Sequence, residues 1–241
     1  MTKRPSAART LAPRARTRAP PAKRGRKPPR NAPPSASAPY HHGGLRDALL
    51  DAAERVLERD GLAGLTLRAV AREAGVSHAA PTHHFRDITG LLSELAAVGF
   101  RQFNAAMAAA GTAGAPPLQN ALARAKAYVA YAQAHPGMYG LMFRSERLDM
   151  SRPSLCEAAN ASFAGLAGSI AATRHEQIAA EALSLEQAAD IARAWSLVHG
   201  FTTLLIDGRL TDIMGRLPKG TEAETLLVAM LKRAMGPRPS A

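Results

Sequence analysis

Apolar residues recur every three to four positions through most of the chain after residue 44, a spacing that places them on one face of a helix. The first such segment starts at Leu45, carries Leu49 and Val56 on its apolar face, and is ended by Gly61. The same pattern predicts helices at 66–74, 77–85, 87–110, 118–135, 154–180 and 184–206, and a last helix from 221 to 233. Residues 138–143 are predicted as a short apolar turn, and no segment alternates as a strand does. The predicted fold class is therefore all-α.

Several of these helices are expected to begin at a capping hydroxyl, which accepts a hydrogen bond from an otherwise unpaired backbone N–H group. Thr66, Ser77, Ser184 and Thr221 stand at such positions. Ser184 and Thr221 each precede a glutamine or a glutamate by three residues, which is the spacing of a capping box.

The formal net charge of +12 is distributed unevenly along the chain. Residues 1–40 contain eleven Lys or Arg and no acid, whereas residues 41–241 carry a net charge of only +1. The same forty residues hold nine of the seventeen prolines. Proline lacks a backbone N–H and like charges repel, so residues 1–40 are predicted to be a disordered basic arm. The rest of the chain is a nearly neutral helical body.

Two short predicted helices, 66–74 and 77–85, are joined by a tight turn that contains Gly75, which is the pattern of a helix-turn-helix. The surface residues of the second helix are small or polar, and no acid occurs from Val76 through Phe85. Such a surface suits phosphates and base edges in the major groove. An ordinary helical corner is an equally good interpretation of the pattern alone.

A family resemblance appears at these residues. The segment 65–85, LTLRAVAREAGVSHAAPTHHF, and more broadly 41–103, resembles the TetR family of bacterial transcriptional regulators. The segment Trp195–Gly200 is similar to the Trp…His-Gly motif of one class of their ligand-binding domains. The resemblance covers about 200 residues and excludes the arm. It implies a homodimer that binds a palindromic DNA operator and a small ligand that releases the DNA.

The resemblance also implies which residues face DNA. The set comprises Arg68, Ser77, His78, Ala79, Ala80, Thr82, His83 and His84. Val76 and Phe85 are expected to hold the second helix against the bundle instead. Many relatives have Tyr at the position of Thr82 and Lys at that of Ile88, so two phosphate contacts are expected to be weaker or missing. Residues 41–90 carry six basic and seven acidic residues, which predicts weak DNA affinity at physiological salt.

The arm is the expected source of additional DNA affinity. The Arg24-Gly25-Arg26 segment looks like the core of an AT-hook, whose arginines enter the narrow minor groove of A·T tracts. A non-specific basic arm that attracts any phosphate backbone is the alternative.

A ligand pocket and a dimer interface are predicted from apolar residues at helical spacing. The pocket set is Phe103, Met107, Tyr128, Met138, Met142, Phe143, Phe163, Trp195 and His199, which indicates an apolar or aromatic ligand without charge pairing. The interface set is Ala194, Leu197, Phe201, Leu204, Leu227, Met230 and Leu231. The alternative in both cases is a plain hydrophobic core.

Chemistry of other kinds is not expected. His83 and His84 are adjacent on a helix and point about 100° apart, so they are poorly placed to chelate one metal ion. No nucleotide-binding, hydrolase or metalloprotease motif is present, so neither an enzyme nor a cofactor is predicted. Cys156 is predicted to be a buried small hydrophobe, with a redox role left open.

The predicted organisation is a disordered arm at 1–40, a helix-turn-helix domain at 41–90, a helical ligand-binding and dimerisation domain at 91–236 and a short tail at 237–241. No apolar run is long enough to span a membrane, and the protein is expected in the bacterial cytoplasm. The predicted function is a ligand-responsive dimeric repressor. The alternative is a DNA-architectural, nucleoid-associated dimer that uses its basic arm.

Overall fold

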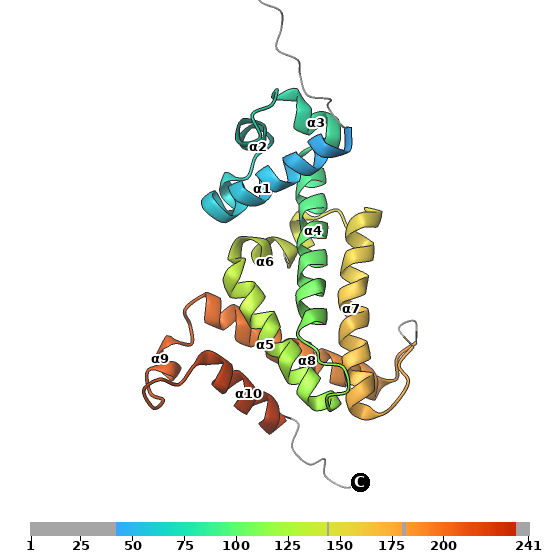
Figure 1. The fold of residues 1–241 in the computed structure, drawn as a ribbon, viewed down its shortest axis with the longest axis vertical. Helices are drawn as coiled ribbons and strands as arrows, with labels where there is room; N and C mark the ends of the chain where they lie inside the picture. The colour runs from blue at the N-terminus through green and yellow to red at the C-terminus, as the bar shows by residue number, and fades with distance from the viewer. Residues whose placement is uncertain (1–41, 144, 180–181, 235–241) are drawn as a thin grey trace, which may run out of the picture. The chain divides into compact units, whose positions relative to one another are not determined.

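The computed structural model describes residues 42–143, 145–179 and 182–234. Regular structure in these residues is helical and includes no strand, so the all-α prediction is confirmed (Figure 1). Residues 1–41 lie outside the described part, and with them the predicted arm and its Arg24 and Arg26. The predicted tail at 237–241 lies outside it as well.

Three helices at one end form the predicted helix-turn-helix unit (Figure 1). They are α1 (His42–Gly64), α2 (Leu67–Glu73) and α3 (Ala79–Phe85). The predicted break at Gly61 is present, since this residue has φ +68° and ψ −178° inside α1. The core of the unit contains Leu49, Val56, Val70 and Phe85, each at most 1% exposed.

The long helix α4 (Ile88–Ala109) leaves this unit and continues into the second half of the described chain. It lies side by side with α7 (Pro153–Arg174), and α5 (Pro117–Ala134) and α6 (Pro136–Met142) also pack against it (Figure 1). Because α4 crosses residue 90, the two predicted domains share one continuous helix.

The last helices cover the far end of the bundle (Figure 1). They are α8 (Leu185–Ile206), α9 (Thr211–Met214) and α10 (Ala223–Ala234), and a single 3-10 turn, Ser145–Arg147, precedes α7. A second hydrophobic cluster joins α5, α8 and α10 through Ala125, Val129, Phe201, Leu227 and Leu231. None of the described helices is long and apolar enough to cross a membrane.

Several predicted boundaries are wrong. Residues 138–143 fall mostly within helix α6 instead of a turn. Helix α7 ends at Arg174, because His175 adopts the left-handed conformation with φ 55°. Helix α9 has no counterpart among the predicted helices. Helix α10 begins at Ala223, and the Thr221 hydroxyl donates to the Pro218 carbonyl at 2.7 Å, a contact within the preceding turn.

Two of the four predicted caps are present. Ala69 N–H donates to the Thr66 hydroxyl at 3.1 Å, which caps α2. The Ser184 hydroxyl accepts from Gln187 N–H at 3.2 Å while the Gln187 side chain accepts from Ser184 N–H at 3.1 Å, which is the complete capping box of α8. Each cap satisfies backbone N–H groups that a helix cannot satisfy internally.

Candidate DNA-binding surface and ligand cavity

The turn between α2 and α3 sets the direction of α3. Gly75 has φ +68°, a conformation that L side chains rarely adopt, and Val76 N–H donates back to the Ala71 carbonyl at 3.0 Å. Helix α3 begins one residue after His78, whose side chain makes no capping hydrogen bond. Ser77 contributes its carbonyl instead, which accepts from Ala80 N–H at 3.0 Å. The prediction of Ser77 as a side-chain cap is therefore wrong, and its hydroxyl is available to a partner.

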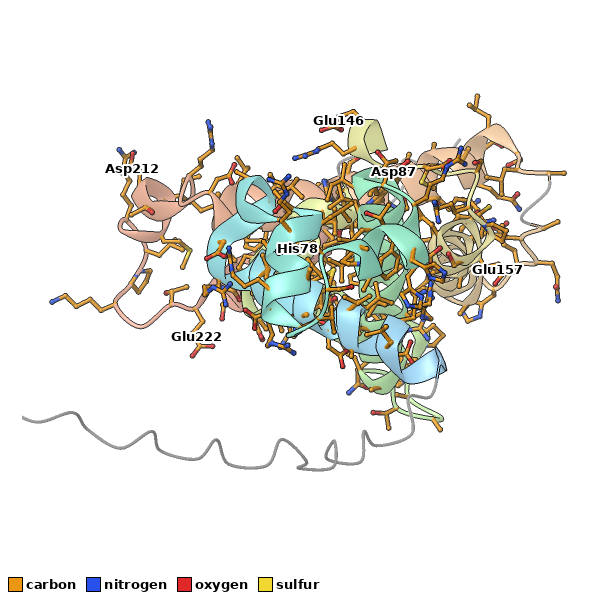
Figure 2. All side chains as sticks on the ribbon, turned by 90° about the horizontal axis from the view of Figure 1, so that it is seen from above. His78, Asp87, Glu146, Glu157, Asp212 and Glu222 are labelled. Carbon is orange, nitrogen blue, oxygen red and sulfur yellow. The ribbon has the colours of Figure 1, made fainter. Side chains whose placement is uncertain are left out.

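The predicted DNA-facing residues gather on the outer side of α2 and α3. Arg68, Ser77, His78, Ala79, Thr82 and His83 are exposed, and Ala80 and His84 are half-buried. Figure 2 views the molecule from the end that carries α2 and α3, and His78 lies on this end. Pro81 and Phe85 point inward and are buried. Helix α3 is thus held by its apolar face and presents a polar face outward.

The nearest acids on either side of this face are engaged in the fold. Glu73 accepts from Arg55 Nε at 3.0 Å and from Arg59 Nη1 at 2.9 Å, and these guanidinium groups lower the pKa of its carboxyl. Asp87 accepts from Gly90 N–H at 2.8 Å and so caps α4. Their charges are partly neutralised by these partners, which reduces the repulsion that a phosphate backbone would meet here.

Arg86 is a candidate DNA contact that sequence analysis missed. It follows α3 directly, its side chain is exposed, and its backbone has φ 74°, which is uncommon for a residue with a side chain. The available signal was a basic residue immediately after the second helix of the motif. Arg86 therefore adds a second exposed cation next to α3, besides Arg68, which was predicted from the sequence.

Phe85 anchors α3 to the rest of the molecule. Its ring is 1% exposed, and the guanidinium carbon of Arg46 lies 5.7 Å from the ring centroid. Arg46 forms an ion pair with Glu94 of α4. Glu94 also accepts a hydrogen bond at 3.3 Å from Nη1 of Arg152, the residue just before α7. This network of ion pairs therefore joins α1 to α4 and to the start of α7.

A second connection runs through α6. The carboxylate of Glu58 in α1 accepts from Met138 N–H at 3.1 Å and from Gly137 N–H at 3.3 Å, which are groups at the start of α6 that lack a partner within the helix. A carboxylate at a helix N-terminus is stabilising. The opposite end of α6 reaches Met142 and Phe143, which line a cavity between the helices.

A cavity of about 1320 Å³ lies among α4, α5, α7 and α8. Eight of the nine residues predicted for a ligand pocket line it, namely Phe103, Met107, Tyr128, Met142, Phe143, Phe163, Trp195 and His199. The ninth, Met138, is 0% exposed and packs on Gly99, where an added Cβ atom would lie 2.6 Å from its sulfur. Met138 therefore belongs to the core, because the missing side chain of Gly99 leaves room for it there.

His199 is the centre of a polar cluster in the cavity wall. Its Nδ1 lies 2.9 Å from the Tyr128 hydroxyl and 2.8 Å from the Tyr139 hydroxyl. Burial lowers the pKa of the His199 imidazole and raises the pKa of both tyrosines. All three groups are therefore neutral near physiological pH and can only donate or accept hydrogen bonds. Such groups can orient a ligand without pairing its charge.

The predicted interface residues separate into two groups. Phe201, Leu227 and Leu231 are at most 9% exposed and pack inside the cluster of α5, α8 and α10. A side chain buried in its own subunit has no surface left for a partner, so these three are core residues and not interface residues. Leu204 is 42% exposed. Ala194, Leu197 and Met230 are half-buried.

Two further predictions concern metal and thiol chemistry. Among the residues with described positions, no group of three His, Cys, Asp or Glu side chains is placed to hold a metal ion. Cys156 is half-buried instead of buried, and Asn160 Nδ2 donates to its sulfur at 3.4 Å. The difference arises because a short side chain on α7 can look small and apolar in the sequence while lying at the border between the packed and the exposed face of the helix.

Comparison with known proteins gives matches over both halves. Residues 49–95 match the family model described as bacterial regulatory proteins, tetR family, and residues 121–232 match the one described as tetracyclin repressor-like, C-terminal domain. A protein of unknown function from Rhodococcus sp. RHA1 is 34% identical, with a TM-score of 0.65 over 82% of this chain and 96% of that chain. No curated protein matches.

Two other solved structures share the fold at 15% identity. One is a bacterial regulatory protein in the tetR family from Rhodococcus RHA1, with a TM-score of 0.55 over 79% of this chain and 95% of that chain. The other is the TetR family transcriptional regulator PfmR from Thermus thermophilus, with a TM-score of 0.52 over 76% of this chain and 94% of that chain. The two family matches agree with the helix-turn-helix of α2 and α3 and with the helical bundle behind it. This chain therefore belongs to the TetR family of DNA-binding transcriptional regulators.

Proposed function

We propose that this regulator is a ligand-responsive repressor, which binds a palindromic operator as a homodimer and leaves it when an apolar or aromatic effector enters the cavity. The observation that carries the proposal is the pairing of an exposed, acid-free face on α3 with a large apolar cavity in the same chain. One feature suits DNA and the other suits a small molecule, so the chain has what a ligand-controlled switch requires.

In this proposal α3 enters the major groove. The exposed side chains of Thr82 and His83 on α3, and of His78 just before it, can hydrogen-bond with base edges or phosphates. Arg68 and Arg86 flank them and can contact the phosphate backbone. Because residues 41–90 carry no net positive charge, most of the remaining affinity is assigned to the arm.

The homodimer is proposed to form through α8 and α10. Leu204 of α8 is 42% exposed, and a partner that covered it would remove this apolar surface from water. With Phe201, Leu227 and Leu231 assigned to the core, the proposed interface consists of Ala194, Leu197, Leu204 and Met230. Two copies of α8 and α10 would then form a four-helix contact, and a two-fold dimer matches a palindromic operator.

Effector control is proposed to act through α6. Its C-terminal end supplies Met142 and Phe143 to the cavity, while its N-terminal end is capped by Glu58 of α1. A ligand that displaces Met142 or Phe143 moves α6 along its axis, and α1 follows through the Glu58 carboxylate. Such a shift changes the position of α3 relative to the α3 of the partner, and the two reading helices no longer match one operator.

The Trp195→Ala variant tests the cavity. We expect it to bind the aromatic probe 8-anilinonaphthalene-1-sulfonate about tenfold more weakly than the wild type, because a large apolar wall is lost, and to keep the DNA affinity of the wild type. Probe fluorescence and DNA-binding anisotropy measure the two properties. Leu185→Ala, an exposed apolar position of the same helix outside both the cavity lining and the proposed interface, is the matched control and should leave probe binding unchanged. Loss of folding in Trp195→Ala, seen by circular dichroism, would instead make Trp195 a core residue.

Deletion of residues 1–40 tests the arm. We expect weaker DNA binding and a flatter dependence of log affinity on log salt, since the slope scales with the number of phosphates neutralised, at about 0.9 for each in duplex DNA. A second variant, Arg24→Gln with Arg26→Gln, distinguishes minor-groove reading from a general charge effect. If the arm reads the minor groove, this variant loses the preference of the wild type for A·T-rich flanks; if the arm acts only by its charge, there is no such preference to lose. An unchanged salt slope after the deletion would show that the arm does not contact DNA.

A further inference from the structure

Arg124 of α5 is a guanidinium in the wall of the cavity, and its described neighbours give it no carboxylate partner. Its Nη1 donates to the Gly165 carbonyl at a long 3.3 Å, and its Nε is buried without any hydrogen-bond partner. A buried donor that lacks a partner costs free energy, and the cost is larger when the group is charged. A partner for this group is therefore missing from the described residues.

The other arginines of the cavity wall are already paired. Arg174 forms ion pairs with Glu176 and Asp190. Arg193 donates to Asp190 at 3.1 Å and to the Ala234 carbonyl at 2.7 Å. Within the described part of the cavity lining, Arg124 is thus the guanidinium that remains available to an incoming anion.

The surroundings of Arg124 indicate the shape of that anion. Tyr128 lies one helical turn further along α5 and lines the same cavity, so the cation is followed by the neutral cluster of Tyr128 and His199. Most of the remaining wall is apolar, with Phe103, Met107 and Phe143, and it also includes the polar side chains of Asn104 and Ser162. One guanidinium without a carboxylate partner, beside a mostly apolar wall, matches a molecule with one charged head and an apolar body.

We infer that the effector is an amphipathic carboxylate, whose head group pairs with Arg124 and whose apolar body fills the cavity. The planar guanidinium can donate two parallel hydrogen bonds to a carboxylate, and one cation balances one negative charge. The inference rests on the proposed function, because it assumes that the cavity holds the effector. It differs from the sequence-based expectation of a ligand without charge pairing.

A matched pair of probes tests the inference. Decanoate and 1-decanol have the same chain length and differ in the charge of the head group. Trp195 is the only tryptophan of the chain and lines the cavity, so its fluorescence reports occupancy for both probes. The wild type is expected to bind decanoate at least about tenfold more tightly than decanol, the effect of one charge-assisted hydrogen-bonded pair.

Substitutions then locate the charge. Arg124→Met is expected to lose the preference for decanoate and to leave decanol binding unchanged, and Arg124→Lys is expected to keep a reduced preference. Arg101→Met, at an exposed position of α4 outside the cavity lining, is the matched control and should change neither probe. If Arg124→Met fails to fold, the Lys variant and the wild-type comparison still decide the result.

The outcomes separate the inference from the proposed function. Equal binding of decanoate and decanol, or an unchanged decanoate affinity in Arg124→Met, overturns the assignment of a carboxylate effector while leaving the cavity as an apolar ligand site. Binding of neither probe overturns both the carboxylate assignment and the proposal that the cavity takes this class of ligand.

Discussion

The Ala79→Glu variant is expected to bind operator DNA at least about tenfold more weakly than the wild type while keeping its fold and its cavity. Ala79 is exposed at the first position of α3, on the face proposed to enter the major groove. A carboxylate there would face phosphates and base edges, and we expect it to cost as much as one mismatched base pair, about 1–3 kcal/mol. A glutamate in the first turn suits the helix dipole, so folding should be unaffected. Fluorescence anisotropy with labelled duplex measures the affinity.

Ala105→Glu is the matched control for this variant. Ala105 is also exposed, but it lies 17 residues after the start of α4, about 25 Å along that helix. The control changes the net charge of the protein by the same amount as Ala79→Glu, and it should lower DNA affinity by less than about threefold. Equal losses in the two variants would mean that only net charge matters, which would contradict a reading role for α3.

The Gly90→Ala variant is expected to destabilise the protein and to weaken operator binding together. An added Cβ atom at Gly90 would lie 2.0 Å from the Phe85 carbonyl oxygen and 2.6 Å from Arg152 Nη2. The carbonyl is backbone at the last residue of α3, so α3 must shift to relieve the overlap. Overpacking of this kind costs about 1–3 kcal/mol or more. Urea unfolding gives the stability, and anisotropy gives the DNA affinity.

Gly140→Ala provides the matched control for the glycine substitution. Gly140 lies inside α6 and an added Cβ atom would have no atom within 4 Å. Alanine is favoured over glycine in a helix by about 0.5–1 kcal/mol, so this variant should be slightly more stable than the wild type. A Gly90→Ala protein as stable as Gly140→Ala would contradict the close packing of α3 on the start of α4.

The helices were predictable where the sequence contains its own boundary signals. Gly61, Thr66 and Ser184 act through their own backbone or through a neighbour three residues away, so local reasoning is sufficient. Helix α6 was not predictable in this way. Its seven residues are stabilised at the N-terminus by Glu58, which lies 79 and 80 positions away from the groups it caps. The early end of α7 at His175 was missed for another reason, since a left-handed residue is expected to be glycine or asparagine.

The candidate sites were predictable to a different extent. Aromatic and methionine residues at helical spacing gave most of the cavity lining, because the interior of a bundle collects such side chains wherever they occur. The pattern could not tell which neighbour covers an apolar stripe, and Phe201 and Leu227 turned out to be covered by their own subunit. Arg124 could not be found either, because a lone arginine on a helix normally faces solvent. Its missing partner is a property of the tertiary structure.

Selection of bound duplexes from a random pool tests most directly whether the helical body, and not the arm, gives the protein its DNA specificity. The selection is run with the full chain and with residues 41–241. Both proteins are expected to enrich the same two-fold symmetric sequence, with half-sites about one helical turn apart, and to keep it in the presence of excess random duplex. Enrichment only when residues 1–40 are present, or binding without any sequence preference, would contradict a reading role for α3 and would favour a DNA-architectural protein.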